Sequence, residues 1–289
     1  MAGAATLEDP SLSLPAHLLM QHERTEPMSC AVAAGKAVLF SARSPDKLTS
    51  NEDSAAVIPV DETSGVLVVA DGLGGERAGQ DASSLAVRTL VDAVRSAPQE
   101  GDVNRLRPAI LDGIETANRL ILEMGVGAAT TIAVVEILDG HVRPYHVGDS
   151  MILVVGGRGK VKLLTISHAP VAMAVEAGLI DEVEAMHHDE RHLVSNVVGS
   201  TDMRIEIGTR LKLAPQDTVV LASDGLTDNL HLNEIIERIR KGKLMKSMDA
   251  LVAAADERMQ TLQPGHPHKP DDLTVIAYRR SRAKRQSKA

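Results

Sequence analysis

Acidic residues stand beside short hydrophobic runs at five separate places in this chain. Each run is rich in Val, Ile, Leu and Ala, the composition of a buried strand, so each acid lies where a strand begins or ends. The acids are Glu52 with Asp53, Asp71, Asp149, Asp224, and Asp271 with Asp272. A single Asp beside a strand is a common turn former. Five clusters that converge at one edge of a sheet would instead repel one another and resist ionisation unless a cation neutralised them.

Carboxylates gathered in this way predict a site for a hard divalent cation. Oxygen ligands in an open site favour Mg²⁺ or Mn²⁺. Gly72 follows Asp71 directly, and because it has no Cβ its backbone carbonyl can approach an ion closely. Gly74 and Gly75 then let the chain turn away. The sequence therefore predicts a metal site assembled from strand ends.

The elements that must position these acids can be read from the periodicity of the apolar residues. Apolar runs predict strands at 36–40, 54–60, 65–70, 130–138, 141–147, 151–157, 160–166, 209–215, 217–223 and 273–279. Helical spacing predicts helices over 76–97 and 104–124, with two more that begin near Asn233 and Lys246. Strands that come in runs, followed by helices in runs, favour an α+β fold.

One domain accounts for most of the chain, since no internal repeat or linker divides it. Residues 1–30 contain three prolines and no sustained periodicity, so we expect an irregular N-terminal extension there. The domain spans 31–280, and a basic tail occupies 281–289. Within the domain, Asp139-Gly140 between two apolar runs predicts a tight hairpin.

Composition excludes several classes of protein. The chain has 31 Lys and Arg against 39 Asp and Glu, and a body this acidic does not suit nucleic acid as a partner. Its one cysteine, Cys30, excludes an intramolecular disulfide and a cysteine zinc site. No apolar stretch reaches the ~20 residues of a membrane helix, and the N-terminus lacks the pattern of a secretory signal. We therefore expect a cytoplasmic protein that contacts neither membrane nor nucleic acid.

Six short motifs, in this order along the chain, resemble those of the metal-dependent protein phosphatase family (PPM, type 2C serine/threonine phosphatases), in its bacterial-like branch. They are NEDS at 51–54, VADGLGG at 69–75, GAATT at 127–131, HVGDS at 146–150, LASDGLTDNL at 221–230 and DDLT at 271–274. The similarity spans roughly residues 36–278 and includes a looser flap segment at 178–200. One such motif would be a weak signal, but six in order are a strong one.

The resemblance implies a four-layer α-β-β-α sandwich, in which helix pairs flank two antiparallel sheets and the metals lie in a cleft at one end. It assigns roles to eight residues and places Asp53, Asp71, Asp224 and Asp271 at the centre of catalysis. Asp71 would bridge two Mg²⁺ or Mn²⁺ ions beside the Gly72 carbonyl, Asp224 and Asp271 would be the other direct ligands, Glu52 and Asp53 would hold metal-bound waters, Asp149 with Asp224 would form a weaker third-ion site, and Asp228 would lie near the metal waters.

The chemistry implied is hydrolysis of phosphoserine and phosphothreonine on proteins. Water that bridges two divalent ions becomes hydroxide near neutral pH and attacks phosphorus in line. The implied partners are a phosphorylated protein substrate and, with it, a kinase and its targets. We expect two tightly bound ions, with a third bound only at high metal concentration, because Ser167 stands where relatives carry an acid.

The chain departs from the family pattern on the substrate side. Leu48 occupies the position of an Arg that grips the phosphate in many relatives. Lys47 is the nearest substitute, but adjacent side chains of an extended strand point to opposite faces. We therefore expect little effect from Lys47→Ala, and a lower KM from Leu48→Arg. These losses leave two alternatives open: a phosphatase-like module that senses or binds with weak or no turnover, and an enzyme for small phosphate esters.

Overall fold

Two antiparallel sheets form the centre of the computed structural model, which describes residues 15–45, 47–74, 76–97, 104–181, 184–185, 188, 190 and 193–281. In the first sheet the strand order is β1-β4-β5-β8-β9-β12, and β13 also pairs with β9. Its strands are β1 (His17–Met20), β4 (Ser54–Pro59), β5 (Ser64–Ala70), β8 (Ile132–Leu138), β9 (His141–Val147), β12 (Glu206–Ile207) and β13 (Leu211–Lys212).

The second sheet has the order β11-β10-β14-β15-β3-β2. Its strands are β2 (Met28–Val32), β3 (Gly35–Ala42), β10 (Met151–Val155), β11 (Val161–Leu164), β14 (Thr218–Ala222) and β15 (Leu273–Arg280). A separate two-stranded ribbon joins β6 (Gly72–Leu73) to β7 (Ala129–Thr130). All these pairings are antiparallel, as the family resemblance implied.

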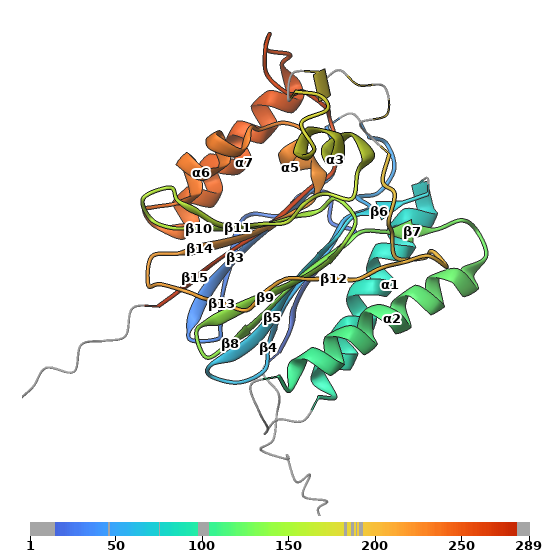
Figure 1. Cartoon of the computed structure of the whole chain (residues 1–289), viewed down its shortest axis with the longest axis vertical. Coiled ribbons are helices and arrows are strands. Elements are labelled where there is room, and N and C mark those ends of the chain that lie inside the picture. Colours follow the sequence, from blue (N-terminus) through green and yellow to red (C-terminus); the bar gives the residue numbers. More distant parts are fainter. Residues whose placement is uncertain are drawn as a thin grey trace, which may run out of the picture.

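Helix pairs cover the outer faces of the two sheets (Figure 1). On the first sheet lie α1 (Glu76–Arg95) and α2 (Leu106–Met124), and on the second lie α6 (Leu232–Ile239) and α7 (Leu244–Gln260). Two short helices, α3 (Pro170–Glu176) and α5 (Asp224–Thr227), lie near one end of the sheets. The predicted α-β-β-α sandwich is confirmed.

Three apolar layers hold this arrangement together. Along β4, Ala56 and Ile58 pack beneath α1 and α2, whereas Ala55 and Val57 face the other sheet. Because both faces of the central strands are buried, their sequences are continuous apolar runs rather than alternating ones. This explains why the strands were predictable from composition alone.

The Asp139-Gly140 turn has the geometry predicted from its sequence. Its two residues have φ of 50° and 70°, the left-handed values that a two-residue type I′ hairpin requires. It connects β8 to β9 with Leu138 opposite His141.

The irregular extension expected over residues 1–30 is wrong for part of that segment. Strand β1 pairs with β4, and β2 pairs with β3, so ordered sheet begins at His17. These strands have mixed sequences, HLLM and MSCAV, and lie at sheet edges. Their pairing with a neighbour, rather than a periodicity of their own, determines their structure. The predicted strand over 209–215 is also shorter, since only Leu211–Lys212 pairs there. Residues 1–14 and the tail from 282 lie outside the described part of the chain.

No helix in the described segments is both long enough and apolar enough to span a bilayer.

Candidate metal centre

The register of the strands brings the predicted acids to one end of the sandwich. Ser54 pairs with Ala70 across β4 and β5, so Asp53 and Asp71, one step beyond, leave the first sheet at the same edge. Ala222 pairs with Val275 in the second sheet, which brings the residues after β14 close to those before β15. Asp224 and Asp271 are among them. Asp149 lies in the connection between β9 and β10, which belong to different sheets.

Electrostatics show that these carboxylates lie close together. Burial raises the pKa of Asp71 well above its ordinary value, and the charges of Asp224, Asp53, Asp149 and Asp271 raise it further. Burial and the charge of Asp272 raise the pKa of Asp53 in the same way. The pKa of Asp149 is raised by burial and by Asp224 from 3.8 to about 7. Such a cluster favours any cation that can enter it.

The protein in chelator should therefore become less stable as the pH rises. A raised pKa means that the folded state retains a proton that the unfolded chain releases, so the stability contributed by Asp149 is present below about pH 4 and lost as the pH rises through about 7. We expect the Tm of Asp149→Asn to exceed that of the wild type in EDTA by a margin that grows between pH 4 and pH 8. A margin that is constant over this range would contradict the prediction.

Two buried carboxylate oxygens provide a test of whether a metal fits here. Glu52 Oε1 and Asp53 Oδ1 have no hydrogen-bond partner among the described residues, and Asp53 is only 1% exposed. Its other oxygen, Oδ2, accepts a hydrogen bond from Ser223 Oγ at 2.7 Å. Unpaired buried oxygens are costly, and a divalent cation or its bound water would pair them. The donor set therefore fits Mg²⁺ or Mn²⁺.

Glycines let the backbone approach this site closely. A Cβ on Gly72 would collide with the backbone of Gly79 in α1, and a Cβ on Gly79 would lie 2.8 Å from Glu52 Oε1. Any larger residue at position 79 would thus fill the space beside an unpaired carboxylate oxygen. The two glycines thus let β6 and α1 pack closely together beside Glu52.

Hydroxyl groups within the motifs hold the acids in position, and the sequence analysis assigned them no role. Thr131 Oγ1 accepts from the Asp71 amide at 3.0 Å, and Thr130 Oγ1 donates to the Asp71 carbonyl at 2.7 Å. Ser150 Oγ lies 2.7 Å from the Thr131 hydroxyl. Ser223, which bonds Asp53, also accepts from the Thr274 amide at 3.0 Å. The motifs GAATT, GDS, ASD and DDLT are therefore partly a scaffold for the carboxylates.

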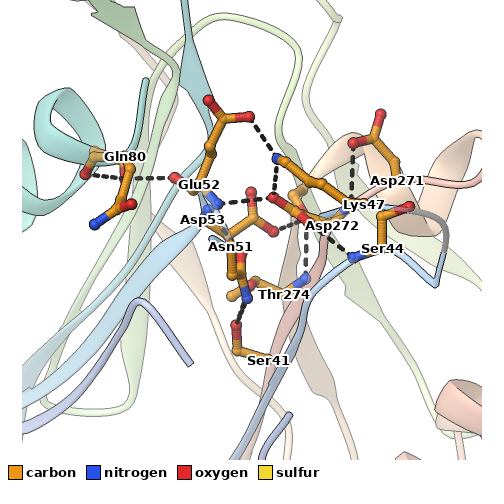
Figure 2. Close-up of polar contacts among 12 residues, drawn as sticks. Ser41, Ser44, Lys47, Asn51, Glu52, Asp53, Gln80, Asp271, Asp272 and Thr274 are labelled. Atoms are coloured by element: carbon orange, nitrogen blue, oxygen red, sulfur yellow. Dashed lines mark hydrogen bonds and ion pairs between the residues drawn. The ribbon is translucent and has the colours of Figure 1, made fainter. Parts of the chain in front are cut away.

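Lys47 reaches the acidic cluster, contrary to expectation. Strand β3 ends at Ala42 and β4 begins at Ser54, so residue 47 lies in a loop and the argument from strand alternation is wrong. Its Nζ donates to Glu52 Oε2 at 2.5 Å and to Asp272 Oδ2 at 2.6 Å (Figure 2). The Leu48 side chain, at the position of the family arginine, is 98% exposed.

Asp272 organises this loop. Its carboxylate is 3% exposed and accepts from the Ser44 amide at 2.8 Å and the Glu52 amide at 2.7 Å, in addition to Lys47. Figure 2 shows Lys47 lying between the carboxylates of Glu52 and Asp272. The sequence marked Asp272 only as an acid before a strand, because its partners are 220 residues or more away along the chain.

A second lysine lies among the acids and was not predicted. Lys269 Nζ is 2.9 Å from one oxygen of each of Asp224, Asp228 and Asp271. Burial alone would lower its pKa, but these three carboxylates outweigh that effect and raise it. Lys269 is therefore a positive charge fixed in the cluster.

A cavity of about 390 Å³ adjoins the acids. Asp149, Asp224 and Lys269 line one part of it, and apolar residues of β10, β11, α3 and α6 contribute to the rest. Ser167 also lines the cavity, and its Oγ accepts from the Ala169 amide at 3.1 Å, at the start of α3. The hydroxyl that replaces the family acid thus has a local structural partner.

A histidine pair fixes the base of the flap to the Asp149 loop. His168 Nδ1 accepts from the Gly148 amide and from Asn196 Nδ2, each at 3.0 Å, so its Nε2 carries the proton and donates to Glu206 at 3.1 Å. The ring of His146 stacks on that of His168, with centroids 4.4 Å apart. Because both nitrogens of His168 have these partners, it serves as an anchor rather than a metal ligand.

Two further histidines each have a backbone partner. His268 Nδ1 lies 2.6 Å from the Arg258 carbonyl, and His188 Nδ1 accepts from the Glu190 amide at 3.1 Å. His187 and His192 lie outside the described residues.

Comparison with known proteins identifies the family. A sequence profile described as protein phosphatase 2C matches residues 46–264. A putative protein phosphatase 2C-type from Streptococcus pyogenes is 33% identical over 178 residues, which cover 59% of this chain and 71% of that protein. The structure of the S. agalactiae serine/threonine phosphatase matches with a TM-score of 0.73 and 28% identity, over 85% of this chain and 99% of that one.

A further structural match holds metal. The catalytic domain of serine/threonine protein phosphatase PstP, in complex with two manganese ions, matches with a TM-score of 0.66 over 85% of this chain and 98% of that one. Its identity to this chain is 23%, so the match shows the common fold. The family profile covers most of the chain, and its span contains five of the six motifs. The chain therefore belongs to the protein phosphatase 2C family, the metal-dependent serine/threonine protein phosphatases.

Proposed function

We propose that this phosphatase hydrolyses phosphoserine and phosphothreonine in proteins with two Mn²⁺ or Mg²⁺ ions held by its strand-end acids. Asp71, with the Gly72 carbonyl beside it, and the carboxylates of Asp224 and Asp271 would supply the direct ligands. Glu52 and Asp53 hold ion-bound water. The observation that carries this assignment is a pair of buried oxygens, Glu52 Oε1 and Asp53 Oδ1, which have no hydrogen-bond partner in the described part of the chain and lie in a cluster of like charges.

The ions, when bound, supply Lewis acidity that lowers the pKa of water and offsets the charge of the phosphoryl oxygens. The chain itself holds the carboxylates in fixed positions. The threonines at 130 and 131 fix the Asp71 backbone, and Ser223 fixes Asp53. Held in this way, the carboxylates need little rearrangement when ions and phosphate enter, which is how preorganised charge favours a reaction.

Lys47 supplies the positive charge that grips the phosphoryl group. Its ammonium has three donors, two of which Glu52 and Asp272 engage. The third has no partner among the described residues, so it can donate to a phosphoryl oxygen beside Glu52. This role removes the main reason to regard the chain as a binding or sensing module without turnover, because the lost arginine is replaced from the neighbouring position.

Metal dependence is the direct test of this proposal. Release of phosphate from a phosphothreonine peptide should stop in EDTA and return when Mn²⁺ or Mg²⁺ is added in excess, because the acids alone provide no electrophile for the phosphoryl oxygens. A small aryl phosphate assayed in parallel reports whether peptide is the better substrate. Full activity in chelator would overturn the mechanism, and absence of turnover with either metal would favour the binding module.

A further inference from the structure

Lys269 is built into the acidic cluster rather than lying across it by chance. Its backbone amide donates to Asn229 Oδ1 at 3.0 Å, and its carbonyl accepts from Asn229 Nδ2 at 2.7 Å. Asn229 is fully buried and also donates to the Gly225 carbonyl at 2.9 Å. One side chain thus ties the Lys269 backbone to the turn after Asp224, which fixes the direction of the lysine side chain.

The ammonium of Lys269 forms ion pairs with the carboxylates on one face of the cluster. It contacts a single oxygen, Oδ2, of each of Asp224, Asp228 and Asp271, all at 2.9 Å. The Lys269 side chain is 24% exposed, so its charge is only partly screened by water. Its charge also acts on Asp149, whose pKa it lowers against the larger raising effects of burial and Asp224. The face defined by Asp149, Asp224 and Asp228 therefore already has a positive charge beside it.

A divalent ion entering this face would meet that charge. Like charges a few Å apart repel each other, and the same three oxygens would have to leave the ammonium. The carboxylate oxygens that Lys269 does not contact are unaffected by this competition, since a carboxylate offers two oxygens. Lys269 thus takes one oxygen from each of Asp224 and Asp271 and leaves the second oxygen of each for an ion of the two-ion site.

We propose that Lys269 is a resident cation that occupies the place of a third metal ion, so that this phosphatase binds two divalent ions and excludes a third. The inference rests on the two-ion site proposed above and concerns ion number rather than turnover. The expectation of a weak third ion at high metal concentration is thus replaced by a specific cause, a lysine whose ammonium already pairs with Asp224 and Asp228.

Counting bound Mn²⁺ tests this directly. Equilibrium dialysis with elemental analysis, supported by titration calorimetry, would compare the wild type with Lys269→Met, which keeps the length of the side chain and removes its charge. We expect two ions per chain in the wild type and three in Lys269→Met, with the third bound at least ~10-fold more tightly than any third ion of the wild type, because affinity follows the net charge of the ligands. Adding Asp228→Asn to Lys269→Met should remove the third ion again.

Two controls separate charge from folding. Lys269→Arg retains the positive charge and should bind two ions, and Lys160→Met removes an exposed lysine and should also bind two. A wild type that binds three ions, or a Lys269→Met protein that still binds two, would overturn the role of Lys269 alone. A wild type that binds no Mn²⁺ would overturn the two-ion site itself, and the inference with it. Thermal melting in EDTA verifies that each variant is folded.

Discussion

Asp71→Asn is expected to abolish turnover and, in chelator, to raise the Tm. The substitution keeps the shape of the side chain but removes the charge that Asp224, Asp53, Asp149 and Asp271 all oppose. Loss of a direct ligand should lower kcat/KM by ~100-fold or more, since even indirect partners of a metal are worth 10- to 100-fold. Relief of repulsion should raise the Tm by about 2–4 °C for each kcal/mol gained in a domain of this size.

Turnover should fall while the Tm in chelator rises, and this combination distinguishes a functional acid from a structural one, whose loss would lower both. A matched control is Asp81→Asn, on the exposed side of α1, which should change neither turnover nor Tm. Excess Mn²⁺ should stabilise the wild type but not Asp71→Asn. A variant that keeps its turnover, or that melts earlier than the wild type in EDTA, would show that Asp71 is not the shared ligand.

Lys47→Met should weaken phosphate binding while leaving metal binding intact or tighter. Removing the ammonium makes the surroundings of Glu52 more negative, which favours Mn²⁺ and disfavours a phosphate dianion. We expect KM for a phosphopeptide and the inhibition constant of inorganic phosphate to rise together by ~10-fold, the value of about one charge-assisted contact. The metal-free protein should also lose about 3 kcal/mol of stability, since the buried Asp272 loses its cation.

The affinities for Mn²⁺ and for phosphate should change in opposite directions in Lys47→Met, and this difference tests whether Lys47 binds the phosphoryl group. If Lys47 only supported the loop, its loss would disorder Glu52 and weaken Mn²⁺ and phosphate alike, and that result would overturn the assignment. Lys47→Arg should retain part of the phosphate affinity, and Lys160→Met should behave as wild type. Leu48→Arg, expected from sequence to lower KM, should now have little effect, because the side chain at position 48 faces solvent.

The parts of this protein that could be predicted from sequence are those determined by local patterns. Strands such as β5 and β14 are buried on both faces, so most of their residues are apolar. Their ends are marked by Asp71 and by Ser223-Asp224. The acids at those ends were identified for the same reason. Strand β1 was missed because its four residues, HLLM, are held by pairing with β4, and no property of so short a segment predicts such pairing.

The contacts of both lysines depend on chain segments far apart in sequence. Lys47 meets Asp272 225 residues away, and the direction of its side chain follows from the loop between β3 and β4 rather than from strand alternation. Lys269 is positioned by Asn229, 40 residues earlier. A lysine near an acid in sequence is usually a solvated charge, so neither contact could be distinguished from that case before the two sheets were assembled.

The proposed ligands belong to both sheets of the sandwich. Asp53 and Asp71 extend from strands of the first sheet, and Asp224 and Asp271 from strands of the second. Along most of their length these sheets meet through an apolar layer that includes Val57, Leu67 and Leu221. The distance between the ligands of the first sheet and those of the second thus depends on the thickness of that layer. A substitution in the layer that thins or thickens it would alter the affinity for metal without touching a ligand, so the affinity of this centre for its ions depends on hydrophobic packing as well as on charge.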